Sequence, residues 1–370
     1  MNPTLTPIQD LKRHYDVLAN ELKTTAQRVL DSGWYVLGNE VKSFEKEFAA
    51  YLGATECISV ANGTDALELA LRAFQIGPGD EVCTVANAGM YSTIAILSAG
   101  AKPVFVDVQA ETLTMCPNSL SACITNKTKV IIVTHLYGCM ADLEAILKLA
   151  RARNLPVIED CAQAHGAKHL NRTAGTWGDI GCYSFYPTKN LGALGDGGAL
   201  STNDPKLAER LRRLRQYGWS SRYHSDDCGG RNSRLDELQA AFLRVKLPYL
   251  NTWNARRRYI ARAYNEAFRN YPVRLPKLGN GSHVAHLYVM CLPQREAFRE
   301  KLTAAGIGND VHYPLPDYAQ NSVRKQLGEQ PILPVTEEAC RQVVTLPCFP
   351  ELTDSEVEKV IKAVQSAFQK

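Results

Sequence analysis

The stretch Cys57-Ile-Ser-Val-Ala-Asn-Gly-Thr-Asp-Ala-Leu67 passes from an apolar run through a glycine turn into the start of an amphipathic helix. The apolar positions of this helix repeat at helical spacing, and they are Leu67, Ala70, Leu71 and Phe74. Gly77-Pro-Gly79 then ends the pattern, as glycine and proline do at helix termini. Because a strand followed by a helix is the repeating unit of α/β folds, this stretch predicts that fold class.

The same alternation recurs downstream. Four further apolar runs alternate with helical patterns: Glu81-Val-Cys-Thr-Val85, Pro103-Val-Phe-Val106, Val130-Ile-Ile-Val133 and Pro156-Val-Ile158. Continuous apolar runs of this length are typical of strands that are covered on both faces. The sequence therefore predicts an α/β fold with a mostly parallel central sheet flanked by helices.

The strand pattern weakens near residue 250. Beyond it we expect one weaker strand at residues 287–292 and helices at about 294–305 and 354–368. We therefore predict a large domain over residues 1–250 and a smaller C-terminal α+β domain over residues 251–370.

Local signals also mark helix ends. Residues 1–50 indicate two helices with a break at residues 31–38. Asp204-Pro205 is typical of a helix start, and Gly218 is expected to end that helix. Ser233-Arg-Leu-Asp236 resembles a capping box ahead of another amphipathic helix.

Composition narrows the class of protein. Of the 370 residues, 45% are hydrophobic and 22% are charged, which is ordinary for a globular protein with a sizeable core. A net charge of +4, from 42 basic and 38 acidic residues, argues against a dedicated nucleic-acid binder. No apolar run is long enough to span a membrane, and the first residues do not resemble a signal peptide. The eleven cysteines form no C-x-x-C pair, so we expect no disulfide framework, no metal site and a cytoplasmic location.

Three segments carry polar groups of chemical interest, and the first contains Gly63 and Thr64. At the start of a helix, free backbone N–H groups and the positive end of the helix dipole point outward together. This arrangement suits a phosphate group. The alternative is an ordinary helix cap by Asn62 or Thr64.

The second segment, Val157-Ile-Glu-Asp-Cys-Ala-Gln-Ala-His-Gly166, places two carboxylates at the end of an apolar strand. Ligands of open α/β sheets bind at the carboxyl ends of strands, and Asp160 can pair there with a protonated ring nitrogen. The alternative for Asp160 is a helix cap or a structural ion pair. His165, next to a glycine, is more simply explained as a structural group.

The third segment, Ser184-Phe-Tyr-Pro-Thr-Lys-Asn-Leu-Gly-Ala-Leu-Gly-Asp-Gly-Gly198, surrounds Lys189 with small residues. A lysine amine can form a Schiff base with an aldehyde, although most lysines are solvated surface charges. A phosphate cradle, a strand-end aspartate and a glycine-flanked lysine together match the phosphate, ring nitrogen and aldehyde of pyridoxal 5′-phosphate.

With these motifs the chain resembles the DegT/DnrJ/EryC1/StrS sugar aminotransferase family, which has the aspartate-aminotransferase fold (fold type I). The match extends over nearly the whole chain, and the stretches that carry it are residues 33–38, 62–67, 158–166, 184–198, 232–241, 311–314 and 346–350. The resemblance implies pyridoxal 5′-phosphate as cofactor, with pyridoxamine 5′-phosphate as its aminated form.

The resemblance also implies roles for single residues. Around the phosphate, Gly63, Thr64 and Ser184 would hold the cofactor of the same chain. Asn232 matches a residue that reaches the phosphate of the neighbouring subunit, which implies a homodimer with shared active sites.

Around the ring, the resemblance implies that Asp160 binds the pyridine nitrogen, Gln163 bonds to the phenolic oxygen and Lys189 forms the Schiff base. The family usually has an aromatic residue that stacks on the ring, but our alignment places Gly89 there. Tyr91 or Met90 is then expected to cover the ring instead.

The implied reaction moves an amino group from glutamate or glutamine to a nucleotide-linked keto sugar by a ping-pong mechanism, in deoxyaminosugar biosynthesis. Within the family the chain is most similar to enzymes that aminate C3 of dTDP-3-keto-6-deoxyhexoses. Tyr186, His312 and Tyr313 are candidate substrate contacts, and each is equally explained as a packed side chain.

Other functions remain open at this point. C4-aminating sugar enzymes and cyclitol aminotransferases share most of the motifs, and a regulatory protein that binds the cofactor without catalysis is an alternative of another class. A sugar dehydratase would have histidine in place of Lys189, and a nicotinamide enzyme would need G-x-G-x-x-G after the first strand. The arginines of residues 209–215 and 256–258 are better explained as solvated helix faces than as a diphosphate site.

Overall fold

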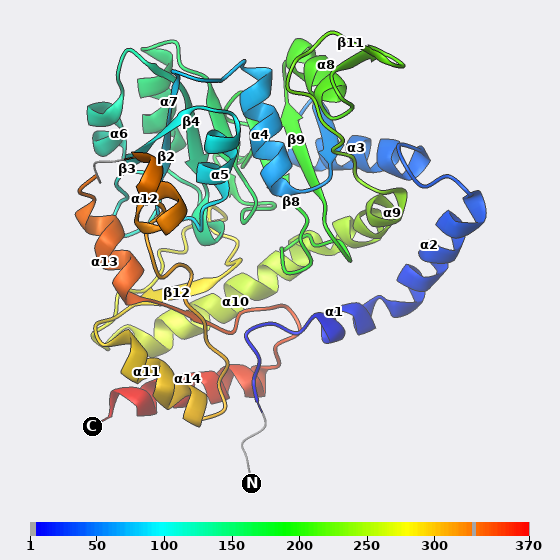
Figure 1. Cartoon of the computed structure of the whole chain (residues 1–370). Coiled ribbons are helices and arrows are strands. Elements are labelled where there is room, and N and C mark those ends of the chain that lie inside the picture. Colours follow the sequence, from blue (N-terminus) through cyan, green and yellow to red (C-terminus); the bar gives the residue numbers. More distant parts are fainter. Residues whose placement is uncertain (1–4, 328–330, 370) are drawn as a thin grey trace.

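The computed structural model describes residues 5–327 and 331–369. Its main sheet has seven strands, and helices lie on both faces of this sheet (Figure 1). The strands, in spatial order, are β1 (Glu56–Val60), β9 (Gly198–Thr202), β8 (Ile180–Ser184), β5 (Val157–Asp160), β4 (Thr128–Thr134), β2 (Glu81–Val85) and β3 (Lys102–Val106). Only β9 runs antiparallel to its neighbours, so the prediction of a mostly parallel sheet is confirmed.

The five apolar runs of the sequence correspond to β1–β5, and their ends differ by at most two residues. The strands β8 and β9 were not predicted. Each contains a glycine, Gly181 or Gly198, together with serine, so neither has the continuous apolar run by which the other strands are recognised. β8 pairs with β5 and β9 pairs with β8, so β8 is part of the edge where the site forms.

Side chains of each strand alternate between two separate cores, one on each face of the sheet. In β4, Val130 and Ile132 belong to one core, whereas Ile131 and Val133 belong to the other. The first core is covered by α4 (Gly63–Ala73), α5 (Tyr91–Ser98) and α8 (Pro205–Leu214). The second is covered by α3 (Asn39–Leu52), α6 (Pro117–Cys123), α7 (Leu143–Arg151) and α9 (Glu237–Lys246).

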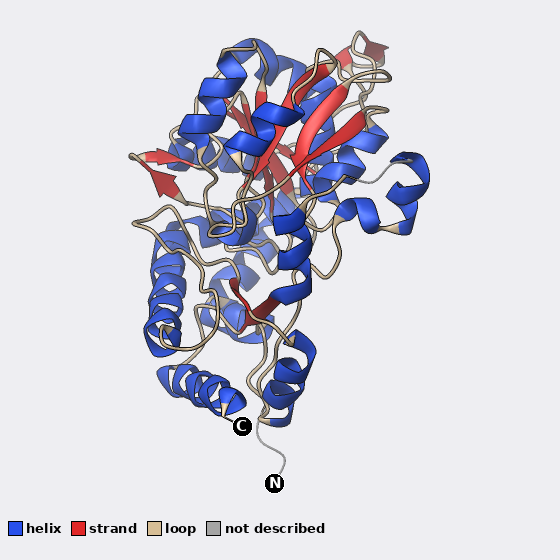
Figure 2. Cartoon of the chain, turned by 90° about the vertical axis from the view of Figure 1, so that its left-hand side faces the viewer, coloured by secondary structure: helices blue, strands red, loops and turns tan. Residues whose placement is uncertain are grey.

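A third core lies below the sheet in Figures 1 and 2, where the chain from α10 onward packs on itself. Its main elements are α10 (Leu250–Phe268), β12 (Tyr288–Cys291), α11 (Arg295–Ala304), β13 (Val343–Leu346) and α14 (Asp354–Phe368). The strand and the two helices expected in this region lie within two residues of their predicted positions. The division into domains at residue 250 stays a prediction.

The remaining elements are short or peripheral. They are α1 (Leu11–Val17), α2 (Ala19–Ser32), α12 (Asn321–Leu327), α13 (Pro334–Gln342), β6 (Lys168–His169), β7 (Arg172–Thr173), β10 (Trp219–Ser221) and β11 (His224–Ser225). The first of the two predicted N-terminal helices is interrupted at Leu18, and the predicted break before α3 is present. All eleven cysteines are free. In the part of the chain that the structure describes, no helix is long and apolar enough to cross a membrane.

Two of the helix-end predictions need correction. Asp204 caps α8 as predicted, but that helix ends at Leu214, before Gly218. The expected capping box at Ser233-Arg-Leu-Asp236 does not form, because the Ser233 hydroxyl accepts a hydrogen bond from Ala61 N instead. The neighbouring Glu237 carboxylate accepts hydrogen bonds from Gly38 N, Glu40 N and Val41 N, so it caps α3 rather than its own helix.

The core between α3 and the sheet is where we expect mutations to destabilise the fold most. Phe48 of α3 is fully buried, and its ring packs against Phe44, Tyr183 and Phe185. We expect Phe48→Ala to lower the free energy of unfolding by about 3–5 kcal/mol, because it opens a cavity between α3 and the sheet. Urea denaturation measures this loss. Ile332→Ala, at a side chain that is 87% exposed, should change the stability by less than about 0.5 kcal/mol.

Candidate active site

A cavity of about 580 Å³ lies where the carboxyl ends of β1, β5 and β8 meet the C-terminal part of the chain. The predicted site residues that line it are Gly63, Thr64, Asp160, Gln163, Ser184, Tyr186, Lys189, His312 and Tyr313. Carboxyl ends of parallel strands are the usual ligand sites of open α/β sheets. The three segments that the sequence singled out are therefore brought together at one place.

Gly63 begins α4 directly after β1, in contact with the end of β8. A Cβ added to Gly63 would lie 2.6 Å from Ser184 Cβ, so only glycine allows this approach. Asn62 does cap the helix, since its Oδ1 accepts a hydrogen bond from Asp65 N at 2.8 Å. That bond leaves the earlier amides of Gly63 and Thr64 at the positive end of the helix, and the arrangement suits an anion.

Asp160 is 5% exposed at the end of β5, where burial raises the pKa of its carboxyl above the ordinary value. Hydrogen bonds from Ala162 N (3.1 Å) and Thr134 Oγ1 (3.4 Å) and the positive charge of Lys189 act in the opposite direction. A buried carboxylate of this kind is stabilised by a cationic partner in the cavity.

Lys189 lies in the turn after β8, half-buried, with its own N–H donated to Tyr186 O at 2.8 Å. Burial lowers the pKa of its amine to about 8, and the charge of Asp160 opposes this shift. An amine with this pKa is partly neutral near physiological pH, which a nucleophile or a general base requires.

Gln163 is held by both ends of its amide. Its Oε1 accepts a hydrogen bond from Tyr137 N at 2.6 Å, and its Nε2 donates to the Tyr313 hydroxyl at 3.2 Å. An amide nitrogen has two hydrogens, so one of them is left to point at an oxygen acceptor in the cavity.

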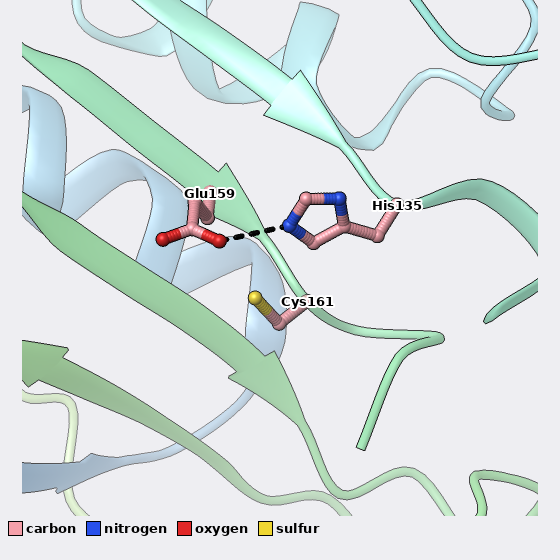
Figure 3. Close-up of side chains that lie close together, drawn as sticks. All are labelled: His135, Glu159 and Cys161. Carbon is pink, nitrogen blue, oxygen red and sulfur yellow. Dashed lines mark hydrogen bonds and ion pairs between the residues drawn. The ribbon is translucent and has the colours of Figure 1, made fainter. Parts of the chain in front are cut away.

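Glu159 lies next to Asp160 but on the opposite face of the sheet, because side chains alternate along a strand. Figure 3 shows its carboxylate facing His135, with Cys161 nearby. Glu159 bonds to His135 Nε2 at 2.9 Å, and it also accepts hydrogen bonds from the backbone N–H groups of Gly175, Trp177 and Gly178. Because these bonds occupy the carboxylate, Glu159 and His135 have a structural role in the fold.

The position expected to carry an aromatic residue, Gly89, faces the ring of Tyr313. A Cβ at residue 89 would lie 2.7 Å from Tyr313 Cε1. Met90 is directed away and packs in the core around Phe105, whereas Tyr91 lines the cavity with its side chain 47% exposed.

The comparisons with known proteins agree with this geometry. Residues 16–365 match the model of the DegT/DnrJ/EryC1/StrS aminotransferase family. The chain belongs to that family. A dTDP-3-amino-3,6-dideoxy-alpha-D-galactopyranose transaminase of Aneurinibacillus thermoaerophilus is 46% identical, over 97% of this chain and 99% of its own.

Two further relatives of this aminotransferase cover it almost completely. A UDP-N-acetyl-3-dehydro-alpha-D-glucosamine 3-aminotransferase of Acidithiobacillus ferrooxidans is 41% identical, over 98% of each chain. The crystal structure of S. venezuelae DesV in complex with a ketimine intermediate has a TM-score of 0.96 at 40% identity, and 99% of each chain is covered. The predicted family and fold class are thereby confirmed.

Some predicted residues of the aminotransferase lie away from the cavity. Asn232 is exposed and does not line it. His165 is buried against Tyr183 and Phe185, and burial lowers the pKa of its imidazole to about 3, so it is neutral and structural.

The two arginine-rich stretches also have partners within the fold. Arg213 pairs with Asp227, and Arg215 contacts Glu45. Arg257 is buried and donates to the carbonyl oxygens of His286 and Cys348. The expectation of solvated helix faces is therefore wrong for Arg215 and Arg257, which are buried in the fold.

Sequence reasoning missed several residues of the cavity wall: Ile8, Gln9, Asp196, His286, Leu287, Asp310, Leu346 and Cys348. The N-terminal segment reaches the cavity because Thr6 pairs with the C-terminal part, where Thr6 O accepts a hydrogen bond from Gly308 N at 2.8 Å. No local pattern in residues 5–10 indicates this long-range pairing. Leu346 and Cys348 lie in a stretch that matched the family, and that match was the available signal.

The electrostatic interaction between Lys189 and Asp160 can be tested in the protein without its cofactor. Labelling of Lys189 by an amine-reactive reagent, followed by mass spectrometry, should be half-maximal near pH 8. In Asp160→Asn the midpoint should move to lower pH, because the charge that raises the lysine pKa is removed. Asp196→Asn, at an exposed carboxylate of the same cavity, should shift it much less. A midpoint that Asp160→Asn leaves unchanged or raises would contradict the assignment.

Proposed function

We propose that this chain is a pyridoxal 5′-phosphate-dependent aminotransferase that moves an amino group from glutamate or glutamine to C3 of a nucleotide-linked keto sugar, a dTDP-3-keto-6-deoxyhexose. The observation that carries the proposal is the convergence of Lys189, Asp160 and the start of α4 on one cavity. Family membership supports the transfer of an amino group. Amination of such a keto sugar is a step of deoxyaminosugar biosynthesis, and we propose this as the role of the enzyme.

The residues of the cavity fit each part of this cofactor. The amides of Gly63 and Thr64 and the Ser184 hydroxyl suit the phosphate, since the glycine leaves room beside the serine. Buried Asp160 suits the protonated ring nitrogen, and the oriented Nε2 of Gln163 suits the phenolic oxygen. Lys189, with its lowered pKa, suits the aldehyde.

When bound, pyridoxal 5′-phosphate supplies an aldehyde that takes up amino groups and a ring that withdraws electrons. Asp160 keeps the ring nitrogen protonated, because a buried carboxylate favours a cation beside it. The Lys189 amine acts as the general base that removes the proton from the α-carbon of the amino donor. Its pKa of about 8 allows it to accept and return that proton near neutral pH. Donor and acceptor use the same site in turn, so the kinetics are ping-pong.

The choice of C3 rests on what the relatives have in common. The relatives from Aneurinibacillus thermoaerophilus and Acidithiobacillus ferrooxidans differ in nucleotide, but both names refer to an amino or keto group at C3. A cavity of about 580 Å³ has room for a sugar beside the cofactor. Tyr186 and His312 are the proposed sugar contacts, since Tyr186 is 52% exposed in the wall and His312 is fixed by a 2.8 Å hydrogen bond to Thr345 Oγ1.

We propose a homodimer in which Asn232 of one subunit reaches the cofactor phosphate of the other. Asn232 is exposed and outside the cavity of its own chain, which favours a role toward a neighbour. Charge supports the same idea. The charged lining residues of the described chain are three aspartates and Lys189, whereas a nucleoside diphosphate and glutamate are both anions. A second subunit is the proposed source of the missing positive charge.

The domain boundary and the cellular location are part of the same proposal. A boundary between domains near residue 250 is supported by the separate core that forms from α10 onward. A cytoplasmic location is supported by eleven free cysteines, most of them buried.

Visible absorption tests the cofactor and the donor together. The purified protein, reconstituted with pyridoxal 5′-phosphate, should have a yellow absorption band that bleaches when glutamate is added. Lys189→Ala should lack that band, because no amine holds the cofactor, and borohydride trapping should place the cofactor on Lys189 in the wild type only. Lys168→Ala, at an exposed lysine over Tyr51, is the matched control and should behave as the wild type. A wild-type protein that stays colourless would overturn the proposal and favour a non-catalytic role.

Complementation tests the shared site. Lys189→Ala and Asn232→Ala subunits are co-expressed with different tags, and the mixed dimer is isolated. If Asn232 serves the neighbour, one site of the mixed dimer has both native residues, so cofactor binding and turnover should recover to about half of the wild type. Mixed dimers that are no better than their parents would show that Asn232 acts within its own subunit or not at all.

A further inference from the structure

Resting on the proposed function, we infer that Tyr313 is the aromatic side chain that covers the cofactor ring, in the place left free by Gly89. The ring comes from the segment between α11 and α12, far from residue 89 in the sequence. In this chain the aromatic residue that stacks on the cofactor ring would therefore come from the C-terminal part of the molecule and not from the segment after β2.

The first observation is the contact between the two residues. A Cβ at residue 89 would lie 2.7 Å, 2.9 Å and 3.0 Å from three ring carbons of Tyr313. These distances are shorter than any van der Waals contact, so the ring already occupies the volume that a side chain at residue 89 would enter. Gly89 also has φ +79°, a conformation that glycine adopts without strain.

The second observation is the orientation of the tyrosine. Its hydroxyl accepts the hydrogen bond from Gln163 Nε2, and its ring lines the cavity together with Asp160 and Lys189. Since Gln163 is itself fixed by Tyr137 N, the hydroxyl end of Tyr313 is held beside the groups proposed to bind the ring. The Tyr137 hydroxyl also donates to His312 O, which holds the backbone just before Tyr313.

The third observation is a buried carboxyl that ties the two segments together. Asp317 is 1% exposed, and its carboxylate accepts hydrogen bonds from Met90 N at 3.0 Å and Thr93 Oγ1 at 2.6 Å. Its own N–H donates to Ala86 O at 2.8 Å. These three bonds flank Gly89 and keep it against the segment that carries Tyr313, so Asp317 acts as a positioning residue.

Tyr91 is the competing aromatic residue. It is 47% exposed, and its ring meets that of Tyr313 edge-on at 6.5 Å between centroids. Tyr313 is packed against Gly89 and hydrogen-bonded to Gln163, so it loses less conformational freedom when a flat ring binds against it. These differences favour Tyr313 over Tyr91.

The test is the affinity of the full-length protein for pyridoxal 5′-phosphate, titrated into the apoprotein and followed by tryptophan fluorescence and visible circular dichroism. Tyr313→Leu should weaken binding about tenfold, the size of one aromatic stacking contact, and reduce the dichroism of the cofactor band. Tyr313→Phe keeps the ring and should bind within about twofold of the wild type. Tyr91→Leu, the matched control, should also stay within about twofold.

Gly89→Ala tests the contact itself. It should weaken binding in the wild-type background and do so less when combined with Tyr313→Leu, because the clash with the ring is then absent. Unchanged affinity in Tyr313→Leu, or a larger loss in Tyr91→Leu, would overturn the inference while the wild type still binds the cofactor. A wild type that binds no pyridoxal 5′-phosphate would instead refute the proposed function. Far-UV circular dichroism checks that each variant is folded.

Discussion

Side chains alternate between the two faces of the sheet at the end of β5, so two neighbouring carboxylates have different surroundings. Glu159 turns to one face of the sheet, where His135 and three backbone amides hold it. Asp160 turns to the other face and lies at the cavity with few hydrogen bonds of its own. A shift of the strand by one residue would exchange the faces of these two side chains and place Glu159, not Asp160, in the cavity. The position of the reactive groups therefore depends on the register of β5 between β4 and β8.

The rest of the cavity is built around that strand end. The glycine at the start of α4 allows the helix to approach Ser184 of β8, and the turn after β8 returns Lys189 toward Asp160. The burial that lowers the pKa of the lysine is the same burial that raises the pKa of the aspartate, so each group gains from the charge of the other. The fold of the aminotransferase thus sets the positions and pKa values of Lys189 and Asp160 without any contact to a substrate.

Much of this arrangement could be predicted from the sequence, because local patterns determine it. Apolar runs indicated β1–β5, and the motifs around Gly63, Asp160 and Lys189 indicated residues that meet at the cavity. The strands β8 and β9 were missed because glycine interrupts their apolar pattern. Residues that come from distant segments left no local signal, as with Gln9 beside Thr188 and Asp317 beside Thr93. The departure at Gly89 was visible in the sequence, but only the fold shows Tyr313 in its place.

The second half of the reaction gives the most direct test of the proposed amination at C3. The protein is converted with glutamate, freed of the donor, and mixed in a single turnover with either a dTDP-3-keto-6-deoxyhexose or its 4-keto isomer. We expect the 3-keto sugar to restore the original visible band and to become aminated, while the 4-keto isomer reacts far more slowly. Restoration by the 4-keto sugar alone, or by neither sugar, would contradict the proposed amination of a dTDP sugar at C3.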